Sequence, residues 1–263
     1  MLIKRVLSAI VLIPLVGAAV YFGGIALFLL VLVAALGAGY EYLAMMRRKG
    51  QAPSYVLGLL FVGLFVVDAQ WPQFRLLPLG LVFIPLLALT AEVFHGNAPG
   101  SLFNWALLVS GGVYIGFPLS HFVRLRLLEH GLYWVVIALL GTWVCDTAAY
   151  FVGCSIGRHK FFPKISPKKT WEGAIAGLVF GVLAVALLSR FLLGLWLGWG
   201  TLLGLLLVLG ATFGDLAESV IKRQVGVKDS SNLIPGHGGL LDRVDSLLFV
   251  VPIVYYFAVA LGG

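Results

Sequence analysis

Long apolar runs recur along the whole chain, and only short polar segments separate them. A helix of roughly 20 apolar residues is long enough to span the hydrocarbon core of a bilayer, which is about 30 Å thick. Such segments must satisfy their own backbone hydrogen bonds, and these runs lack the alternation that is typical of barrel strands. With 61% hydrophobic and only 11% charged residues, the chain is predicted to be an all-α polytopic membrane protein.

About nine transmembrane helices are expected, and the first two form a hairpin that turns at Gly23 and Gly24. Their expected ranges are 4–22, 24–46, 54–70, 76–94, 102–123, 132–153, 172–193, 200–222 and 245–261. We treat residues 1–263 as a single integral membrane domain, with N-terminal helices over 1–130 and catalytic helices and cytoplasmic loops over 131–263. A signal peptide, with Gly17-Ala18-Ala19 as a poor cleavage site, is the alternative for the first run. That run continues directly into a second one, which better fits an uncleaved anchor.

Lysine and arginine fall mostly in the loops on one side of the expected bundle. If the N-terminus is cytoplasmic, the only basic residues left outside are Arg75, Arg124, Arg126 and Arg190. This bias predicts a multi-pass protein of the cell inner (cytoplasmic) membrane with its N-terminus inside and its C-terminus outside. Arg124 and Arg126 do not fit this bias, so the number of spans between residues 53 and 131 is left open to a change of one. The net charge of +7 lies in loops beside apolar spans, which suits lipid headgroups and phosphates better than nucleic acid.

Two of the expected helices carry polar residues three or four positions apart, a spacing that places them on one helix face. The residues are Asp146 and Tyr150 in the first helix, and Asp215, Glu218, Ser219 and Lys222 in the second. At 1.5 Å per residue, Asp146 and Asp215 both lie roughly 10–12 Å inside the cytoplasmic helix ends. Asp242 and Asp245 enter the last helix from the same side.

Carboxylates gathered at one depth repel one another unless cations hold them. Mg²⁺ suits such a place, because it takes oxygen ligands and is usually held by one or two carboxylates together with substrate phosphates. The alternative is that each acid forms a structural ion pair with Lys222, Arg223 or Arg243. Three further acids lie near other helix ends and are expected to reach water by snorkelling, namely Glu41, Asp68 and Glu92.

Two cytoplasmic loops have the composition of phosphate-binding segments. The first, from Gly157 to Gly173, is expected to end in a helix capped by Ser166 or Thr170, with Pro167 in its first turn. Lysines crowd this helix N-terminus and favour an anion there, although an ordinary positive-inside loop is the alternative. In the second loop, residues 226–242, glycines let backbone amides approach a phosphate. We expect its histidine to contact phosphate rather than to transfer a proton.

The segment from Ser219 to Asp245 resembles the signature of the phosphatidate cytidylyltransferase (CDP-diacylglycerol synthase) family. The matching positions are Ser219, Lys222, Arg223, Lys228, Asp229, Pro235, His237, Gly238, Gly239, Asp242, Arg243 and Asp245. A second region of the family resembles Asp146-Thr147 with Tyr150 and Gly153, followed by Ser166-Pro167 and Lys169-Thr170-Trp171. The resemblance is specific over residues 142–245 and only general before them.

This resemblance implies an integral membrane nucleotidyltransferase that joins CTP to phosphatidate and gives CDP-diacylglycerol and pyrophosphate, with Mg²⁺ as cofactor. The residues alone lead to carboxylates, a metal and phosphate-binding loops, whereas the cytidine and the diacylglycerol come from the resemblance. Membrane lipids are further expected partners. A second cation and a homodimer are left open, and no nucleic acid is expected.

Roles follow for the matching residues. Asp215 and Asp242 are expected to bind the metal, with Glu218 and Asp245 as further ligands and Asp146 as a ligand or orienting group. The groups expected to neutralise phosphate are Lys222, Arg223, His237 and Arg243, and Lys168 and Lys169 are expected to hold CTP or pyrophosphate. Further substrate contacts are expected at Lys164, Ser166, Thr170, Ser219, Lys228, Asp229, Gly238 and Gly239.

Two other classes of protein remain as alternatives. An ion-coupled transporter also carries intramembrane acids, but they should lie at the midplane of inverted repeats rather than near one face beside lysine-rich loops. A related CTP-using lipid enzyme, such as an ether-lipid cytidylyltransferase or a polyprenol kinase, is disfavoured by the full match between Ser219 and Asp245.

Overall fold

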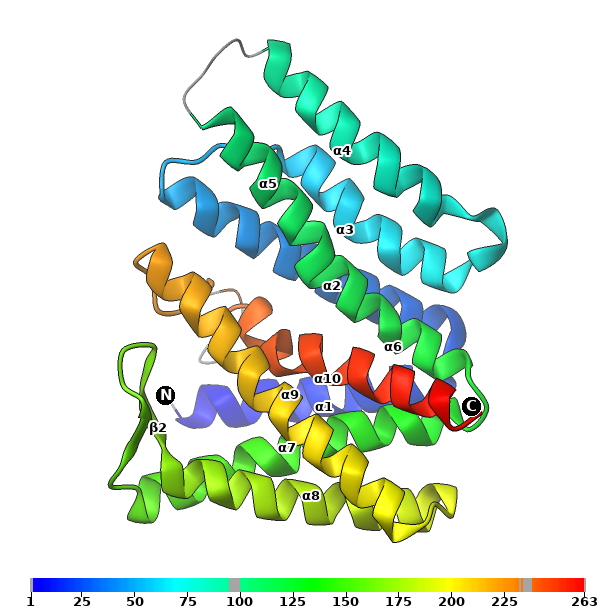
Figure 1. The fold of residues 1–263 in the computed structure, drawn as a ribbon, viewed down its shortest axis with the longest axis vertical. Coiled ribbons are helices and arrows are strands. Elements are labelled where there is room, and N and C mark those ends of the chain that lie inside the picture. Colours follow the sequence, from blue (N-terminus) through cyan, green and yellow to red (C-terminus); the bar gives the residue numbers. More distant parts are fainter. Residues whose placement is uncertain (1, 95–99, 232, 234–237, 263) are drawn as a thin grey trace. The chain divides into compact units, whose positions relative to one another are not determined.

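The computed structural model describes residues 2–94, 100–231, 233 and 238–262. Within these residues the chain is almost entirely helical (Figure 1). Seven helices of this described part are long and apolar enough to cross a membrane, and two shorter apolar helices lie at 12–22 and 55–70. The prediction of an all-α polytopic membrane protein is therefore confirmed, with nine as the approximate number of spans.

Each expected span has a helical counterpart in the described part of the chain. The helices are α1 (Leu2–Phe22), α2 (Gly24–Arg48), α3 (Tyr55–Gln70), α4 (Leu76–Phe94), α5 (Ser101–Gly111), α6 (Phe117–Leu127), α7 (Gly131–Ile156), α8 (Trp171–Leu193), α9 (Leu197–Gln224) and α10 (Leu241–Ala260). A 3₁₀ turn, η1 (Pro72–Phe74), precedes α4, and a π-helical turn, η2 (Gly112–Gly116), joins α5 to α6 in one span. The expected turn between the first two helices is present, and Gly23 and Gly24 have φ of 64° and 51°, a region that favours glycine.

The chain divides into two compact units. One comprises residues 1–124 and 224–244, and the other comprises residues 125–223 and 245–263. We call them the first and the second unit and describe each separately.

The first unit packs α2, α3, α4, α5 and η2 around an aromatic core. Phe61, Phe65 and Leu108 are almost completely buried there. A β-carbon at Gly116 of η2 would lie 2.6 Å from the Val62 carbonyl oxygen, so only glycine allows this approach to α3.

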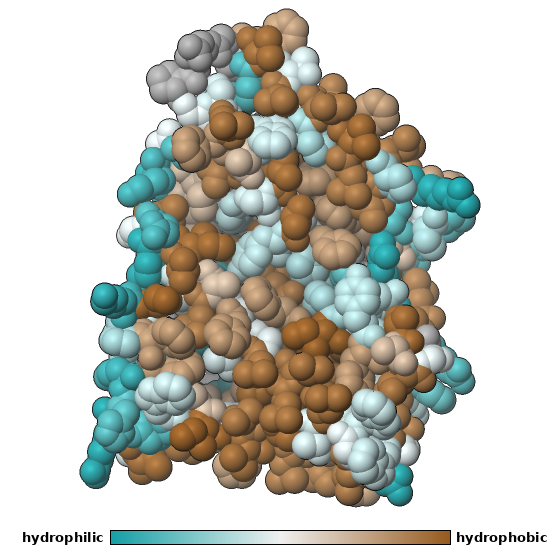
Figure 2. All heavy atoms as spheres, in the orientation of Figure 1, coloured by the Kyte–Doolittle hydropathy of each residue, from teal (hydrophilic) through white to brown (hydrophobic). Residues whose placement is uncertain are grey.

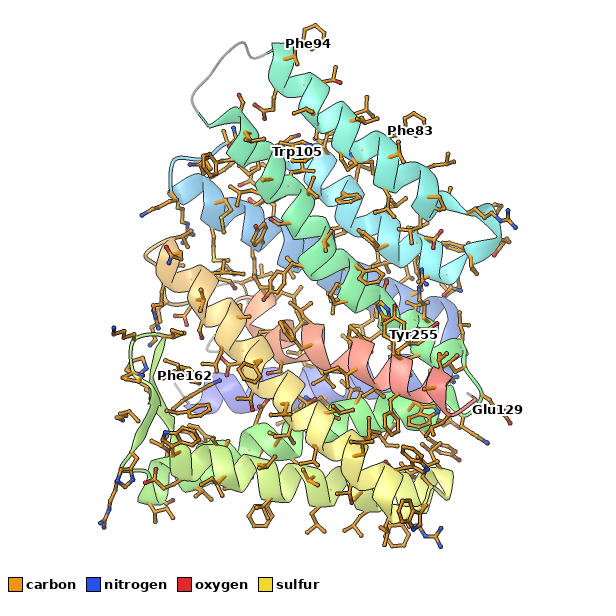
Figure 3. The ribbon with its side chains drawn as sticks, viewed as in Figure 1. Phe83, Phe94, Trp105, Glu129, Phe162 and Tyr255 are labelled. Atoms are coloured by element: carbon orange, nitrogen blue, oxygen red, sulfur yellow. The ribbon has the colours of Figure 1, made fainter. Side chains whose placement is uncertain are left out.

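The outer surface of the first unit is largely apolar, as expected for lipid contact. On α4, Phe83 and Phe94 are exposed and point away from the neighbouring helices (Figure 3). Trp105 of α5 donates to the Pro85 carbonyl over 2.9 Å and so ties α5 to α4. Apolar side chains also dominate the face drawn in Figure 2.

Asp68, at the end of α3, does not snorkel to water. It is 6% exposed and accepts hydrogen bonds from the Leu77 amide and from Arg124 Nη2, over 2.9 and 3.1 Å. The expectation of a solvated acid is wrong here because the fold supplies two donors that the sequence does not place beside it. The same ion pair gives a partner to Arg124, one of the two arginines that do not fit the expected positive-inside bias.

In the second unit, glycines bring α7, α8, α9 and α10 together. A β-carbon at Gly177 of α8 would lie 3.1 Å from the Cys145 carbonyl oxygen on α7, and Gly204 of α9 meets α8 in the same manner. Between α9 and α10, a β-carbon at Gly214 would lie 2.6 Å from the Asp245 carbonyl oxygen. Small residues allow such close helix packing in membranes, where no hydrophobic driving force acts between helices.

A short antiparallel hairpin, β1 (Lys160–Phe162) and β2 (Ser166–Thr170), replaces the loop expected before α8. The expectation that Pro167 opens the helix is wrong, because this residue lies in β2; proline is tolerated in an edge strand. Of the two candidate caps, Thr170 is the one used, and its hydroxyl accepts from the Gly173 amide. Phe161 packs edge to face on Trp171, with ring centroids 4.5 Å apart, and holds the hairpin against α8.

Candidate active site

The C-terminal half of α9 carries the polar stripe that the spacing predicts. Ser219 Oγ donates to Asp215 Oδ1 over 3.3 Å, and Glu218 forms an ion pair with Lys222 one turn later. The Glu218 side chain is fully buried and Lys222 is nearly so. Because an unpaired buried charge is costly, this pair neutralises both groups. The sequence analysis left two roles open for Glu218, metal binding or a structural ion pair. The structure has the ion pair.

The hairpin is attached to α9 at two points. Lys169 Nζ lies 2.8 Å from Asp215 Oδ2, and Arg223 Nε donates to the Ile165 carbonyl over 3.2 Å. Lys169 was expected to hold substrate and Asp215 to hold metal, so two residues with separate expected roles are in direct contact. Both side chains remain partly exposed.

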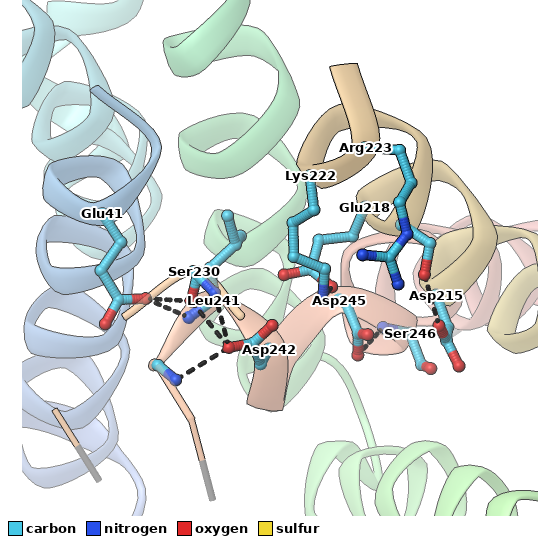
Figure 4. Close-up of polar contacts among 12 residues, drawn as sticks. Glu41, Asp215, Glu218, Lys222, Arg223, Ser230, Leu241, Asp242, Asp245 and Ser246 are labelled. Atoms are coloured by element: carbon cyan, nitrogen blue, oxygen red, sulfur yellow. Dashed lines mark hydrogen bonds and ion pairs between the residues drawn. The ribbon is translucent and has the colours of Figure 1, made fainter. Parts of the chain in front are cut away.

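Asp245 of α10 belongs to the same unit and extends this cluster. Its carboxylate accepts from the Ser246 amide over 2.7 Å (Figure 4). It also lies within electrostatic range of Asp215, Asp146 and Lys222. The close approach of α10 to Gly214 explains why Asp245 lies near Asp215. Asp245 therefore lies within electrostatic range of two other predicted acids of its unit, and Lys169 and Lys222 supply positive charge to this cluster.

Asp242 lies in the first unit, where the loop after α9 folds back on the start of α10. Its Oδ2 atom accepts from the Ser230 amide, the Ser230 hydroxyl and the Gly239 amide, over 3.0, 2.9 and 2.8 Å (Figure 4). Gly238 has φ of 79°, and a β-carbon there would lie 2.7 Å from Asp242 Oδ2. The glycines predicted to approach a phosphate thus also leave room for this carboxylate.

Glu41 is a residue that the sequence analysis missed. It was expected to reach water, but its side chain is 3% exposed and accepts four hydrogen bonds from the segments around Ser230 and Leu241. A usable signal existed, because Glu41 lies seven residues before the end of α2, about 10 Å inside the helix. The same depth argument singled out Asp146 and Asp215. Ser230, which contacts Asp242, was also not singled out.

The other predicted residues are mostly exposed. Lys164 is exposed in the hairpin turn, Ser166 and Lys168 lie on β2, Lys228 and Asp229 are exposed in the loop after α9, and Arg243 is exposed on α10. Asp146 is exposed on α7. His237 lies outside the described residues, so its expected role stays a prediction.

A metal site made by protein side chains alone is absent from the described residues, since none of them form a cluster of three or more His, Cys, Asp or Glu side chains able to hold an ion. The donor chemistry nevertheless fits Mg²⁺, because the neighbouring Asp215 and Asp245 offer hard carboxylate oxygens. Mg²⁺ is usually held by one or two carboxylates and completes its shell with water and substrate phosphate.

Comparisons with known proteins agree with the sequence motifs. A model of the family described as "Cytidylyltransferase family" matches residues 3–261. The chain is 36% identical to the phosphatidate cytidylyltransferase of Haemophilus influenzae, with 98% of each chain covered. It is 35% identical to the Bacillus subtilis protein of the same name, over 86% of this chain and 87% of the other. It is also 39% identical to the uncharacterized protein YnbB of Escherichia coli, over 70% of this chain and 65% of the other.

Proposed function

Because this chain belongs to the cytidylyltransferase family, we propose that it transfers the cytidylyl group of CTP to phosphatidate, giving CDP-diacylglycerol and pyrophosphate. The observation that carries this proposal is the near full-length match to relatives named phosphatidate cytidylyltransferase, at 34–36% identity. The site adds chemical support, since it combines carboxylates with lysines at the ends of membrane helices.

In the proposed reaction, a phosphate monoester oxygen of phosphatidate attacks the α-phosphorus of CTP. A new O–P bond forms while the bond from the α-phosphorus to the oxygen that bridges to the β-phosphorus breaks. Pyrophosphate leaves with that electron pair. The monoester is already largely dianionic near neutral pH, so the protein need not supply a strong base, and catalysis consists mainly of alignment and charge neutralisation.

The cationic residues would carry the charge neutralisation. We propose that Lys222, Arg223, Arg243 and His237 face the phosphates and that Lys168 and Lys169 hold the nucleotide. Lys222 is paired with Glu218, and the ion pair fixes the position of its ammonium group on α9. Lys169 is held at Asp215, next to the acids of the second unit.

Mg²⁺ is part of this proposal as the cofactor. Asp215 and Asp242 would hold it, with Asp245 as a further ligand, and Glu218 is a weaker candidate because it is paired with Lys222. A bound Mg²⁺ supplies positive charge that offsets the negative charge of the transferring phosphoryl group. Three hydrogen-bond donors fix the Oδ2 atom of Asp242, and so hold its carboxylate in one orientation for metal binding.

The proposal also includes the membrane location. We infer a bacterial inner membrane with the N-terminus and the loops after α7 and α9 on the cytoplasmic side, because most lysines and arginines fall there and CTP is cytoplasmic. The acyl chains of the substrate would then stay in the bilayer.

The test is product identification with purified protein in detergent. The protein is given CTP together with one of three acceptors, namely phosphatidate, an ether-linked analogue or a polyprenol. We expect it to convert phosphatidate, and mass spectrometry should find CDP-diacylglycerol in the lipid phase. Phosphorylated polyprenol, or a product from the ether lipid alone, would assign the chain to a different CTP-using reaction.

A further inference from the structure

The Glu41 carboxylate is almost completely buried, although it lies in an apolar membrane helix. Each of its oxygens accepts two hydrogen bonds. Oε1 accepts from Ser231 Oγ and the Leu240 amide, over 2.6 and 2.9 Å, and Oε2 accepts from Ser230 Oγ and the Leu241 amide, over 2.9 and 2.8 Å. A buried carboxylate is tolerated only when such donors replace water.

These four donors lie on both sides of one loop. Ser230 and Ser231 precede residues 232–239, and Leu240 and Leu241 follow them. One carboxylate therefore binds both the segment at 230–231 and the segment at 240–241, and it does so from α2, about 190 to 200 positions earlier in the chain. Gly37, one turn before Glu41 on α2, packs against Leu240, where a β-carbon would lie 2.6 Å from the leucine side chain.

Glu41 is linked to Asp242 through Ser230. The Ser230 hydroxyl lies 2.9 Å from both Glu41 Oε2 and Asp242 Oδ2, and it has a single proton to share between them. The Ser230 amide donates to Asp242 in addition. Glu41 also bonds the Leu241 amide, the residue directly before Asp242, and its negative charge stabilises the N-terminus of α10.

We propose that Glu41 is a positioning residue, which fixes the orientation of Asp242 and of the backbone at 238–241 without touching the substrate. The inference rests on the proposed function insofar as Asp242 binds the metal there. All of the contacts that carry it lie within the first unit.

The test compares Glu41→Gln with a matched control. Glutamine replaces one acceptor oxygen by an amide group that can only donate, so two of the four donors lose their partner. Asp68→Asn is the control. Asp68 is a second buried carboxylate of the same unit that also accepts a backbone amide, but it bonds Leu77 and Arg124 instead of the segments around Asp242.

The first readout is amide hydrogen exchange of purified protein in lipid nanodiscs. Glu41→Gln should speed exchange at Ser230 and at 239–241 by about tenfold, the effect of losing one or two buried hydrogen bonds, whereas Asp68→Asn should leave these amides unchanged. Unchanged exchange in Glu41→Gln, or equal acceleration in both variants, would overturn the proposal.

The second readout is the Mg²⁺ concentration that gives half-maximal CDP-diacylglycerol formation at saturating CTP. Glu41→Gln should raise it about tenfold, and Asp68→Asn should not change it. Faster loop exchange with an unchanged Mg²⁺ dependence would overturn the link to Asp242. If the wild-type protein forms no CDP-diacylglycerol, the proposed function fails, while the exchange experiment still decides whether Glu41 fixes the backbone at 238–241.

Discussion

Lys169 on β2 and Asp215 on α9 form an ion pair of 2.8 Å, which joins a proposed nucleotide-binding residue directly to a proposed metal ligand. An ammonium group and a divalent cation compete for the same carboxylate. A cation that binds Asp215 would therefore free Lys169 for the phosphates of CTP, and the hairpin that carries Lys169 would respond to metal binding.

We expect Lys169→Met to change nucleotide and metal binding in opposite directions. The KM for CTP should rise about tenfold, the equivalent of one lost charged hydrogen bond, while Mn²⁺ should bind more tightly in the absence of nucleotide because its competitor is gone. Steady-state kinetics and Mn²⁺ electron paramagnetic resonance measure the two effects. Lys160→Met, on the exposed partner strand, is the control. If both quantities match the wild type, the ion pair has no part in substrate or metal binding.

The close approach at Gly214 predicts a second effect. In Gly214→Ala the new β-carbon would collide with the Asp245 carbonyl oxygen and separate α9 from α10. We expect a loss of about 1–3 kcal/mol in stability and a disproportionate loss of activity, because Asp215 and Asp245 move apart. Gly17→Ala, where a β-carbon meets nothing within 4 Å, should be neutral in both thermal unfolding and turnover. Normal stability and turnover in Gly214→Ala would contradict the packing described here.

The ion pair of the buried Asp68 with the partly exposed Arg124 predicts a coupling in stability. Arg124→Met should destabilise the protein by about 3 kcal/mol, since it leaves the Asp68 carboxylate buried without its cation. Asp68→Asn removes that charge but keeps an oxygen acceptor for the Leu77 amide, so the double variant should recover most of the loss. A double-mutant cycle by thermal unfolding in detergent measures the coupling. Additive effects would mean that the ion pair contributes nothing.

The sequence predicts the helices and the stripe on α9 well, for physical reasons. Apolar length determines where a chain can cross a bilayer, and the spacing of Asp215 and Ser219 determines that they meet on one helix turn. Thr170 is likewise identified as a candidate cap by its position before an apolar run. These features depend on residues that are near one another in the chain.

The partners of Glu41 and Asp68 could not be predicted in this way. Glu41 meets donors about 200 positions away, and Asp68 meets Arg124 on a different helix, so their environments depend on tertiary packing. The hairpin before α8 was missed because a lysine-rich segment with a proline is equally typical of a loop. In the structure Lys160 pairs with Thr170, and Phe161 beside it contacts Trp171 of α8.

The central claim is that aspartates of α9 and α10 support a metal-dependent cytidylyl transfer. The most direct test is pyrophosphate release from CTP and phosphatidate across a Mg²⁺ titration, for the wild type, Asp215→Asn and Asp242→Asn, with insertion and folding checked by thermal unfolding. We predict that release requires phosphatidate, CTP and Mg²⁺, and that each variant folds but loses at least 100-fold in rate, roughly the loss expected for a metal ligand or its supporting group. Near-native release from either folded variant would contradict the assignment of that aspartate, and metal-independent release would contradict the account as a whole.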